Sequence, residues 1–553
     1  MEAALEIEQQ ELARKNELRQ LELARRKALL EVALNKALIY KSNRDLCELF
    51  IQLSTTKLVC VQLEEKIVIY KWDADTTLYQ KIGIIELSAL VMDELGIYLE
   101  TNIDSIENDI IGARMDMNET QLARLRDRLK NFQKLRGIVF NLANVKKVAA
   151  LVAARVVDKT FYAKLDMDPH VINCTNVLID LRTGHSRYRT PKDFFSKTLD
   201  FRYTNRVDPV ITANVQQLFL DICNGKPLDD EAMKQWLGYS MTGLTTEQMA
   251  MWAVGYTAAN GKSTLSIIFM AMFSIYCMKF NNRLYDIGYE KSHKQYAESR
   301  GIRYAVIEEA NTTNMDIQGV KDDLDGCKKG SVEIMYGTCQ SIQINFKLHL
   351  ISNFNANFKV DRGIRRRFLY FAHETEFLHN ADLEAREDKT NCRLLKKDIR
   401  SNCEDPAYKL ALFQILLPYA LRYYEKMKLD GCSHLKEEWE AKCDDNDKMA
   451  EFIDKYYTKG GKNMVYKEDF VRDYRKFTRL DNIGFANISN DISRLRIKYD
   501  RQKESGTDTN GVRRRGFLMG LKRNDARLPG QDKEQKGLDA VDVESTEEEV
   551  IDI

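Results

Sequence analysis

The sequence predicts a multidomain α+β protein with a mainly helical N-terminal region, an α/β core and a C-terminal winged helix. A chain of 553 residues is too long for one compact core, and typical domain sizes predict about three or four domains. Between residues 250 and 375, apolar runs rich in β-forming residues alternate with helical segments, which is typical of an α/β sheet. Hydrophobic residues make up 44% of the chain and charged residues 30%, as in an ordinary globular protein.

The N-terminal region is mainly helical in its pattern and contains one hairpin. Residues 1–40 are rich in Ala, Leu, Glu, Gln, Arg and Lys without a clean heptad, which favours a solvated helical arm or a linker over a coiled coil. Helical patterning then continues, interrupted at 66–83 by the alternating stretch KIVIYKWDADTTLYQKIG, which predicts a β-hairpin. Asp73 and Asp75 in this stretch fit either a metal-binding pair, as in a primase or polymerase, or a turn. Turn aspartates are the commoner case.

Five apolar runs predict the strands of the α/β core. They are MAMWAVGY, YCMKF, IRYAVI, FKLHLIS and RRFLYF. Before them, residues 171–191 predict a strand, a Thr-Gly turn and a second strand, and residues 213–243 predict helix. After the core, residues 467–523 predict two helices, a strand, a glycine-containing loop and a strand, which is the pattern of a winged helix.

Cysteine usage and hydropathy exclude several classes of protein. The 11 cysteines contain no Cys-x-x-Cys, and Cys432-Ser-His434 has no second pair to complete a zinc site, so free thiols in a reducing compartment are expected. The N-terminus lacks the apolar run of a signal peptide, and the apolar run at 265–278 is too short to span a bilayer. We therefore expect a soluble, intracellular protein.

Residues 255–264, GYTAANGKST, are similar to a phosphate-binding loop. A strand-like run precedes them and a helix-forming run follows, which is the context that such a loop requires. Asn260, Gly261 and Thr264 would bring backbone N–H groups to the start of the helix, where the dipole favours phosphate. Lys262 would bridge the β- and γ-phosphates, and the Ser263 hydroxyl would hold Mg²⁺. The alternative is a glycine-containing turn with a chance lysine.

The start of this loop is irregular. The usual first glycine would stand at position 256, which is occupied by Tyr256, and Gly255 comes one residue early. We expect Gly255 to take over the turning role and Tyr256 to adopt an ordinary backbone conformation. Gly261, by contrast, should not tolerate a side chain.

Polar residues at the ends of the following runs would complete the site. Glu308 and Glu309 follow the run IRYAVI, where a carboxylate pair is costly unless it meets Mg²⁺ and the attacking water. We assign Glu308 to the hydration shell of the metal and Glu309 to polarising the water. Asn353 ends the run FKLHLIS and could touch the γ-phosphate or orient the water, although a strand-end asparagine is ordinarily a turn former.

Three adjacent arginines precede the last run of the core: Arg365, Arg366 and Arg367. They form either a solvated basic turn or an arginine finger that acts on the nucleotide of a neighbouring subunit. Taken with the loop, the acidic pair and the asparagine, in that order, they predict a nucleotide hydrolase.

At this point the sequence resembles a superfamily 3 helicase, of the replicative primase–helicase type of large DNA viruses (poxvirus- or iridovirus-like) and some phages. The resemblance rests on Asn260-Gly261-Lys262-Ser263, Glu308-Glu309, Asn353 and Asp361-x-Gly363-x-x-Arg366-Arg367. It extends to NCTNVLIDLRTG (173–184), WLGYSMTGLTTEQ (236–248) and VYKEDFVRDYRKF (465–477).

The resemblance implies an ATP- and Mg²⁺-dependent replicative DNA helicase, a hexameric ring that translocates 3′ to 5′ on single-stranded DNA at a replication fork. It makes Asn353 the sensor and Arg366 or Arg367 the finger, and it suggests fork proteins or a primase as partners, in the host cytoplasm or nucleus. The implied domains are a helical arm or linker (1–40), a mainly helical N-terminal or collar domain with a β-hairpin (41–235), an AAA+-like P-loop ATPase core (236–380), a helical connector (381–445), a winged-helix-like domain (446–525) and an acidic disordered tail (526–553).

Two local patches are candidates for DNA contact, since a net charge of +1 does not by itself indicate nucleic-acid binding. The segment 321–337, with Lys321, Lys328 and Lys329, would project into the channel of a ring or form a plain exposed hairpin. Residues 494–523 hold ten Lys and Arg against three Asp and Glu, an excess of the kind that phosphate binding uses. The candidates there are Arg494, Arg496, Arg513 and Arg514.

Two other functions fit the same motifs. One is an NTP-driven motor that remodels proteins or packages nucleic acid, and the other is a DNA-binding scaffold with an inactive nucleotide site. Stimulation of ATP hydrolysis by single-stranded DNA separates the first from a helicase, and any hydrolysis at all excludes the second.

Overall fold

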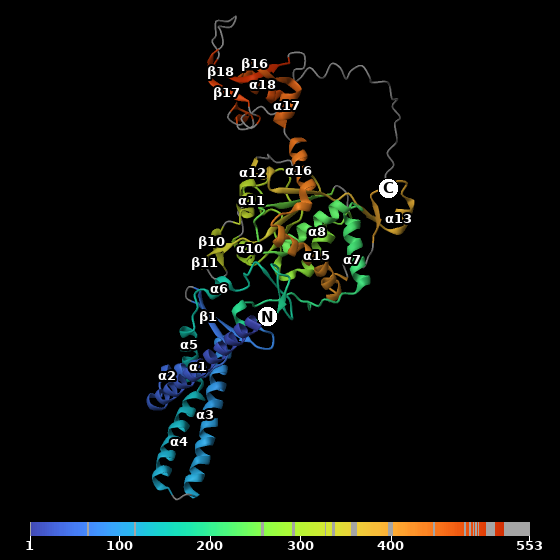
Figure 1. The fold of residues 1–553 in the computed structure, drawn as a ribbon. Coiled ribbons are helices and arrows are strands. Elements are labelled where there is room, and N and C mark those ends of the chain that lie inside the picture. Colours follow the sequence, from blue (N-terminus) through green and yellow to red (C-terminus); the bar gives the residue numbers. More distant parts are fainter. Residues whose placement is uncertain are drawn as a thin grey trace, which may run out of the picture. The chain divides into compact units, whose positions relative to one another are not determined.

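The computed structural model describes most of the chain as helices and strands (Figure 1). The described residues are 2–63, 66–115, 118–255, 259–289, 293–326, 328–334, 338–355, 362–395, 402–445, 448–479, 483–485, 488–489, 492, 495, 497–504 and 515–524. The chain divides into two compact units, Met1–Asn355 with Phe371–Cys432 and Ala356–Tyr370 with Ser433–Ile553.

Helices dominate the start of the first unit, as predicted. They are α1 (Glu2–Tyr40), α2 (Asn43–Leu53), α3 (Ile84–Met115), α4 (Glu119–Val139) and α5 (Leu142–Arg155). Side-chain caps begin three of them: Ser42 accepts from the backbone N–H of Asp45, Asn118 from that of Gln121, and Asn141 from those of Ala143 and Asn144. α3 and α4 lie side by side as a long helical hairpin (Figure 1).

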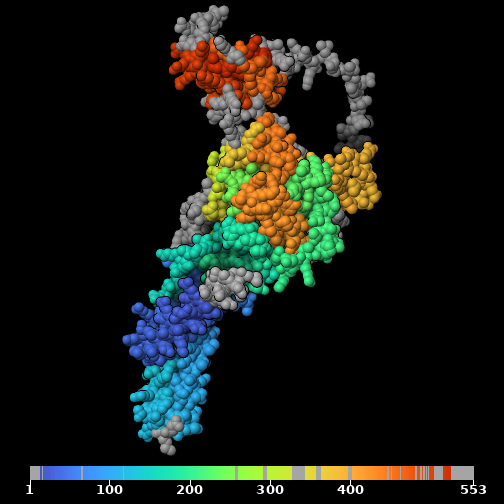
Figure 2. All heavy atoms as spheres, viewed as in Figure 1, coloured from blue at the N-terminus to red at the C-terminus, as the bar shows by residue number. Residues whose placement is uncertain are grey.

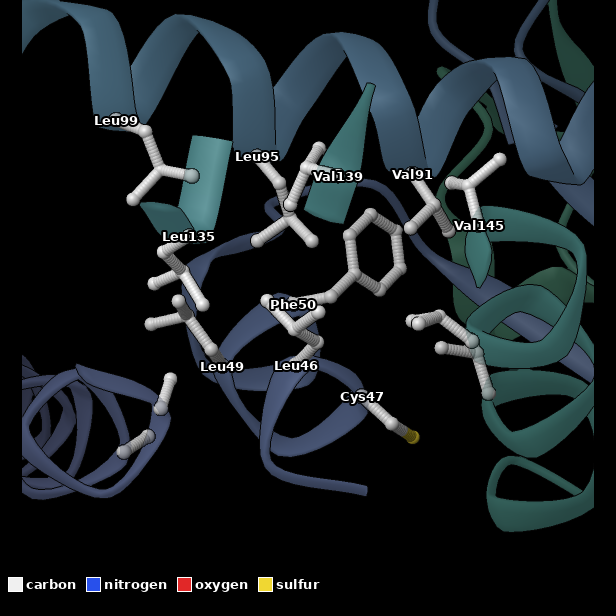
Figure 3. Packing of buried hydrophobic residues seen from close by; sticks show 14 of the residues in the cluster. Leu46, Cys47, Leu49, Phe50, Val91, Leu95, Leu99, Leu135, Val139 and Val145 are labelled. Carbon is white, nitrogen blue, oxygen red and sulfur yellow. The ribbon is translucent and has the colours of Figure 1, made fainter. Parts of the chain in front are cut away.

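The core of this helical region forms where α2, α3, α4 and α5 meet. Figure 3 shows the buried side chains pointing toward one another from these helices. Spacings of three and four residues place them on one face of each helix: Leu46, Leu49 and Phe50 of α2, Val91, Leu95 and Leu99 of α3, Leu135 and Val139 of α4, and Val145 of α5. Burial of each such side chain contributes about 1.5–3 kcal/mol.

The predicted hairpin at 66–83 is present and belongs to a larger sheet. β2 (Lys66–Asp73) and β3 (Leu78–Ile82) pair antiparallel, and β1 (Leu58–Leu63), which the sequence did not predict, pairs with β2. Asp73 accepts hydrogen bonds from Thr76 and Gln80 within the turn. Asp73 therefore acts as a turn former.

Short strands and helices connect this region to the core. The segment 171–191 contains β4 (Val171–Asn173), β5 (Leu178–Asp180) and β6 (Ser186–Arg187), all antiparallel neighbours. The helical prediction for 213–243 is confirmed by α7 (Pro209–Ile222) and α8 (Pro227–Met241). Each has a proline in its first turn, where the missing N–H costs nothing.

The five apolar runs of the core are all strands of one sheet, which confirms the α/β prediction. The strands are β7 (Ala250–Val254), β8 (Cys277–Lys279), β9 (Tyr304–Ile307), β12 (Lys347–Ser352) and β13 (Phe368–Ala372). Their order is β13-β7-β12-β9-β8, and β12 runs parallel to both β7 and β9. The boundary between the two units passes through β13, after Tyr370. Helices that accompany the sheet are α9 (Lys262–Met272), α10 (His293–Glu298) and α11 (Ile317–Leu324).

Two smaller pairs of strands flank the core. The segment expected to project, 321–337, supplies only β10 (Lys328–Ile334), which pairs antiparallel with β11 (Thr338–Gln343) as a hairpin, and the start of the segment belongs to α11. Farther along, β14 (Glu376–Leu378) pairs parallel with β15 (Cys392–Leu394), with α13 (Asn380–Ala385) between them. The first unit then continues with α15 (Pro406–Lys426).

The second unit has its own small core. Its elements are α12 (Arg362–Arg365), α16 (Ser433–Asp445), α17 (Lys448–Tyr456), β16 (Tyr457–Tyr466), α18 (Lys467–Thr478), β17 (Lys498–Glu504) and β18 (Arg515–Arg523). The antiparallel sheet has the order β16-β18-β17. The second of the two helices predicted within 467–523, which we expect at 487–497 as the recognition helix of a winged helix, lies largely outside the described residues, and the acidic tail at 526–553 lies wholly outside them. Whether this unit is a winged helix stays a prediction.

No single helix in the described part of the chain is long and apolar enough to cross a membrane. The pair α4 and α5, bent by 82°, reaches that length and composition only when the two are taken together.

Candidate functional site

Three buried strands bring the predicted site residues to one edge of the sheet. In the parallel register, Ser352 of β12 lies opposite Val254 of β7, and Leu350 lies opposite Ile307 of β9. The chain segments that leave these strands at their carboxyl ends therefore start side by side. Ligands of open parallel sheets bind at this edge.

Lys262, the first residue of α9, is held between Gly255, which follows β7, and Asn353, which follows β12. Its Nζ donates to the carbonyl oxygen of Gly255 at 2.5 Å and to Oδ1 of Asn353 at 3.2 Å. The side chain is buried, and this burial lowers the pKa of Lys262. The structure thus brings together two residues 91 positions apart that the sequence assigned to one site.

Gly255 leaves room for these contacts. A Cβ atom at Gly255 would lie 2.2 Å from Nδ2 of Asn260 and 2.8 Å from Nζ of Lys262. The backbone of Gly255 is not in the left-handed region, and its turning role stays a prediction because residues 256–258 lie outside the described residues. This glycine allows a close approach of side chains. Tyr256 lies outside the described residues.

Both the backbone conformation and the lack of space at position 261 require a glycine. Its φ is +84°, a conformation that residues with a side chain rarely adopt, and it stands immediately before α9. A Cβ atom there would lie 3.0 Å from Ile222 and 3.2 Å from Phe377. These two apolar neighbours form a wall beside the loop that the sequence did not indicate. The expected intolerance of this position to side chains has a structural basis.

Glu308 and Glu309 follow β9 directly but have different surroundings. Glu308 accepts from Nζ of Lys279, at the end of β8, at 2.5 Å and is partly buried. Glu309 is exposed, and its φ of +56° is unusual for a residue with a side chain. Such backbone strain is commonest at functional sites. Lys279 was not predicted as a site residue, although it ends the strand next to β9.

Ser263 and Glu308, the two predicted Mg²⁺ contacts, line one open pocket of about 640 Å³ beside α9. Lys279 lines it as well, and so does Lys409, which is paired with Asp200 at 2.6 Å and Glu404 at 2.7 Å. In the described part of the chain, no group of three His, Cys, Asp or Glu side chains could hold a metal by itself. A hydroxyl with one carboxylate suits Mg²⁺, which takes its other ligands from water and substrate phosphates.

A buried histidine lies behind the loop. The backbone N–H of His373 donates to the carbonyl oxygen of Val254, the last residue of β7, at 2.6 Å. Burial lowers the pKa of His373 well below its usual value, and the nearby His349 and Lys262 lower it further. His373 is therefore neutral and contributes no charge to the site. Only the packing of β13 against β7 reveals this neighbour, so no sequence pattern pointed to it.

The three arginines belong to the second unit and differ in their partners and in their burial. Arg365 pairs with Asp444 at 2.6 Å. Arg367 is buried and donates to the carbonyl oxygen of Gly363 at 2.9 Å. Arg366 has an exposed side chain. Of the two candidates for the finger, Arg366 is thus the one whose side chain is at the surface.

The DNA-binding candidates are only partly described. Lys321 is half-buried in the last turn of α11, and Lys328 and Lys329 lie in β10, opposite Gln343 and Ile342 of β11. Arg494, Arg496, Arg513 and Arg514 lie outside the described residues. Two further residues of this basic segment are placed: Arg515 is exposed, whereas Arg523 pairs with buried Asp473 at 2.7 Å and so stabilises the second unit.

Comparison with known proteins matches residues 66–239 to the family described as "D5 N terminal like". Over 383 residues the chain is 23% identical to the protein named "Putative primase C962R" from two isolates of African swine fever virus. The match covers 65% of this chain and 39% of the relative, so the chain spans well under half the length of these curated relatives.

Two solved structures of the NrS-1 C terminal region are also similar. They share 11% and 12% identity with this chain, cover 61% of it and 81% of their own length, and have TM-scores of 0.36 and 0.35. Such scores are too low to establish a shared fold. The sequence matches confirm the resemblance to viral primase–helicases at a coarse level, because residues 66–239 match a family whose domain is found in primase–helicase proteins.

Proposed function

We propose that the chain is an ATP-driven DNA helicase of a viral replication system, which works as a ring-shaped oligomer. The observation that carries the proposal is the hydrogen bond between Lys262 of the phosphate loop and Asn353, which follows β12, at the edge of the sheet where Glu308 follows β9. The strand order supports it, because β12 lies between the loop strand β7 and the acidic strand β9, as in AAA+ ATPases. The D5 N terminal like domain adds the link to replication.

The residues of the site have complementary roles in the proposed hydrolysis. Backbone N–H groups at the start of α9 and the Lys262 ammonium would hold the phosphates of ATP. Ser263 and Glu308 would hold Mg²⁺ in the pocket that they share, and the metal would have to displace Lys279 from the Glu308 carboxylate. Asn353 keeps Lys262 aimed at the loop.

Glu309 would accept a hydrogen bond from a water molecule and direct its oxygen at the γ-phosphorus. The new P–O bond forms as the bond to the β-phosphate oxygen breaks, and the proton that the water loses would pass by way of Glu309 to the released phosphate, which gives ADP and phosphate. Arg366 of a neighbouring copy would offset the charge that develops on the transferred group. Lys321, Lys328 and Lys329 are proposed to contact the DNA backbone, with translocation from 3′ to 5′.

The test measures ATP hydrolysis by the whole chain with and without single-stranded DNA. The proposal predicts hydrolysis that DNA stimulates and that Lys262→Ala and Glu309→Gln abolish. Hydrolysis without stimulation would favour a motor that acts on protein, and a parent protein without hydrolysis would favour a scaffold with an inactive site. Unwinding of partial duplexes with either a 3′ or a 5′ single-stranded tail then tests the direction.

A further inference from the structure

α4 carries a row of exposed basic side chains on the side of the helix that faces solvent. Arg126, Lys130 and Lys134 follow one another at intervals of four residues, and all three are exposed. At about 100° per residue, they fall within an arc of about 80°, and the buried side chains of α4 lie on the opposite side. Figure 2 shows the hairpin of α3 and α4 (light blue and cyan) with its side chains at the surface.

The charge of this region differs from that of the whole chain. Residues 119–159 contain ten Lys and Arg against three Asp and Glu, in a chain that holds 84 against 83. The neighbouring helix α3 has the opposite balance, with seven Asp and Glu against one arginine. If these charges served only to join the two helices, they would pair with each other. Among the described residues, however, the ion pair of Arg136 with Glu100 is the only one between α3 and α4.

The row costs stability in the chain by itself. Within the part of the chain that the structure describes, no ion pair or side-chain hydrogen bond reaches Arg126, Lys130 or Lys134. Two carboxylates are near, because Asp127 lies at the edge of the row and Glu119 lies about 10 Å before Arg126 along the helix. Like charges four residues apart destabilise a helix. An anion that lies along the row would remove this repulsion.

The chemistry of this side of α4 favours a nucleic-acid backbone over an acidic protein. Between the basic residues the same side presents Ala123, Gln133 and Gly137, so it has no apolar side chain larger than alanine. Protein interfaces have an apolar centre, whereas contacts to phosphates are polar and basic. Four residues of helix rise about 6 Å, which is close to the distance between successive phosphates of one strand. The apolar side of α4 is buried in the helical core and is not available to a membrane.

We propose that Arg126, Lys130 and Lys134 of α4 bind the phosphate backbone of DNA, at a surface separate from the α/β sheet. Each cation meets one phosphate, and the Gln133 amide can donate to a phosphate oxygen beside them. Contacts of this kind position the nucleic acid without reading its sequence. The surface lies within the segment 66–239 that matches the D5 N terminal like family, and it needs no bound nucleotide. The choice of DNA rests on the proposed function, whereas the exposed cations and their spacing do not.

The experiment measures binding of fluorescently labelled DNA to the whole chain by anisotropy, without ATP and at several salt concentrations. Each phosphate contact adds about 0.7 to the slope of log affinity against log salt for a single strand, and about 0.9 for a duplex. Arg126→Ala combined with Lys130→Ala and Lys134→Ala should therefore reduce the slope by about 2 for a single strand or by about 3 for a duplex. Probes of both kinds and of equal length show which form of DNA the surface holds. Alanine favours helix, so circular dichroism should show an unchanged helix content.

A matched control removes the same charges from another helix. Arg19→Ala combined with Lys27→Ala and Lys36→Ala takes one arginine and two lysines, all exposed, from α1 and should keep the slope of the parent. Exchanging arginine for lysine and lysine for arginine at the three α4 positions keeps the charges and should keep the slope as well. An equal loss in the α1 control would reveal a general effect of charge and would overturn the proposal. An unchanged slope in the α4 alanine variant would overturn it too, and would make an acidic protein the partner of this surface.

The binding measurement is independent of ATP hydrolysis, so the two proposals can fail separately. Hydrolysis that DNA stimulates, together with an unchanged slope in the α4 variant, would overturn the inference about α4 alone. A chain that hydrolyses no ATP but shows the expected reduction in slope would overturn the helicase proposal alone. A parent chain that binds neither DNA probe would overturn the inference about α4 directly.

Discussion

Replacing Gly255 by alanine tests the most detailed feature of the candidate site. The new methyl carbon would lie 2.2 Å from Nδ2 of Asn260 and 2.8 Å from Nζ of Lys262, well inside contact distance. One of these side chains must move, and overpacking of this kind costs about 1–3 kcal/mol. If Lys262 moves, it loses its bonds to the Gly255 carbonyl and to Asn353, and with them its place in the loop.

A displacement of about 1 Å of a positioning group can cost about 10²-fold in rate. We therefore expect Gly255→Ala to lower kcat for ATP hydrolysis by about 10²-fold while the chain stays folded. The assay is steady-state phosphate release with saturating Mg²⁺ and ATP, with the melting temperature measured in parallel.

The same chemical change at an unconstrained site is the control. A Cβ atom at Gly112 in α3 or at Gly137 in α4 would meet nothing within 4 Å. Alanine in these helices should raise stability by about 0.5–1 kcal/mol and leave hydrolysis unchanged. Hydrolysis by Gly255→Ala at the parent rate would show that the close approach of Asn260 and Lys262 has no part in the reaction.

Three further variants follow from the structure. Arg366→Ala subunits mixed with Lys262→Ala subunits should recover part of the ATPase rate, because some mixed interfaces join an intact Arg366 to an intact Lys262. A mixture that is no faster than either variant alone would exclude a role of Arg366 in the neighbouring subunit's site. His349 is buried beside the Tyr304 hydroxyl, and this burial lowers the pKa of His349 from 6.5 to about 3. The free energy of unfolding should therefore be unaffected by this group above pH 6.5 and should fall by about 1.4 kcal/mol per pH unit as the pH drops from 6.5 toward 3. His349→Gln should flatten that slope in acid denaturation, and an unchanged slope would place the titrating group elsewhere. Leu95→Ala removes a fully buried side chain from the N-terminal helical core, so the free energy of unfolding of that region, measured in urea, should fall by about 2–5 kcal/mol. A change below about 1 kcal/mol would mean that the core closes around the gap.

Strands were predictable where a long apolar run marks them, and less so elsewhere. Each of the five strands of the core sheet is a compact apolar run: β8 and β12 end in a polar residue, and β7, β9 and β13 are followed directly by Gly255, Glu308 and His373. Their existence and their order along the chain therefore follow from the sequence. β16 was missed because it contains Gly460 and Gly461, which disfavour a strand. The pairing of β16 with β18 shifts register between Lys459 and Met464, and this irregularity accommodates the glycines. β14 and β15 were missed because each is only three residues long.

The sequence predicts which site residues follow the strands, whereas the hydrogen-bond and ion-pair partners of these residues depend on how the strands pack. The sequence placed Lys262, Asn353 and Glu308 at one edge because parallel strands deliver their ends together. It could not show that Lys279 pairs with Glu308, because that contact depends on β8 lying beside β9. The burial of Arg367 beside an exposed Arg366 likewise depends on the turn after α12, which the run of three arginines does not reveal.

Lys347 and Lys262, two of the buried lysines among the described residues, have different numbers of hydrogen-bond partners, and this difference bears on the proposed function. Lys347, at the start of β12, reaches the carbonyl oxygens of Thr242, Leu244 and Asn345, which match the three N–H bonds of its ammonium. Within the described residues, Lys262 reaches two acceptors, and both are uncharged. A buried ammonium costs free energy unless an anion or a full set of acceptors compensates it. Lys347 has the full set and is explained by structure alone. Lys262 is better explained if an anion completes its coordination, and a phosphate group at the start of α9 is the anion that this position favours.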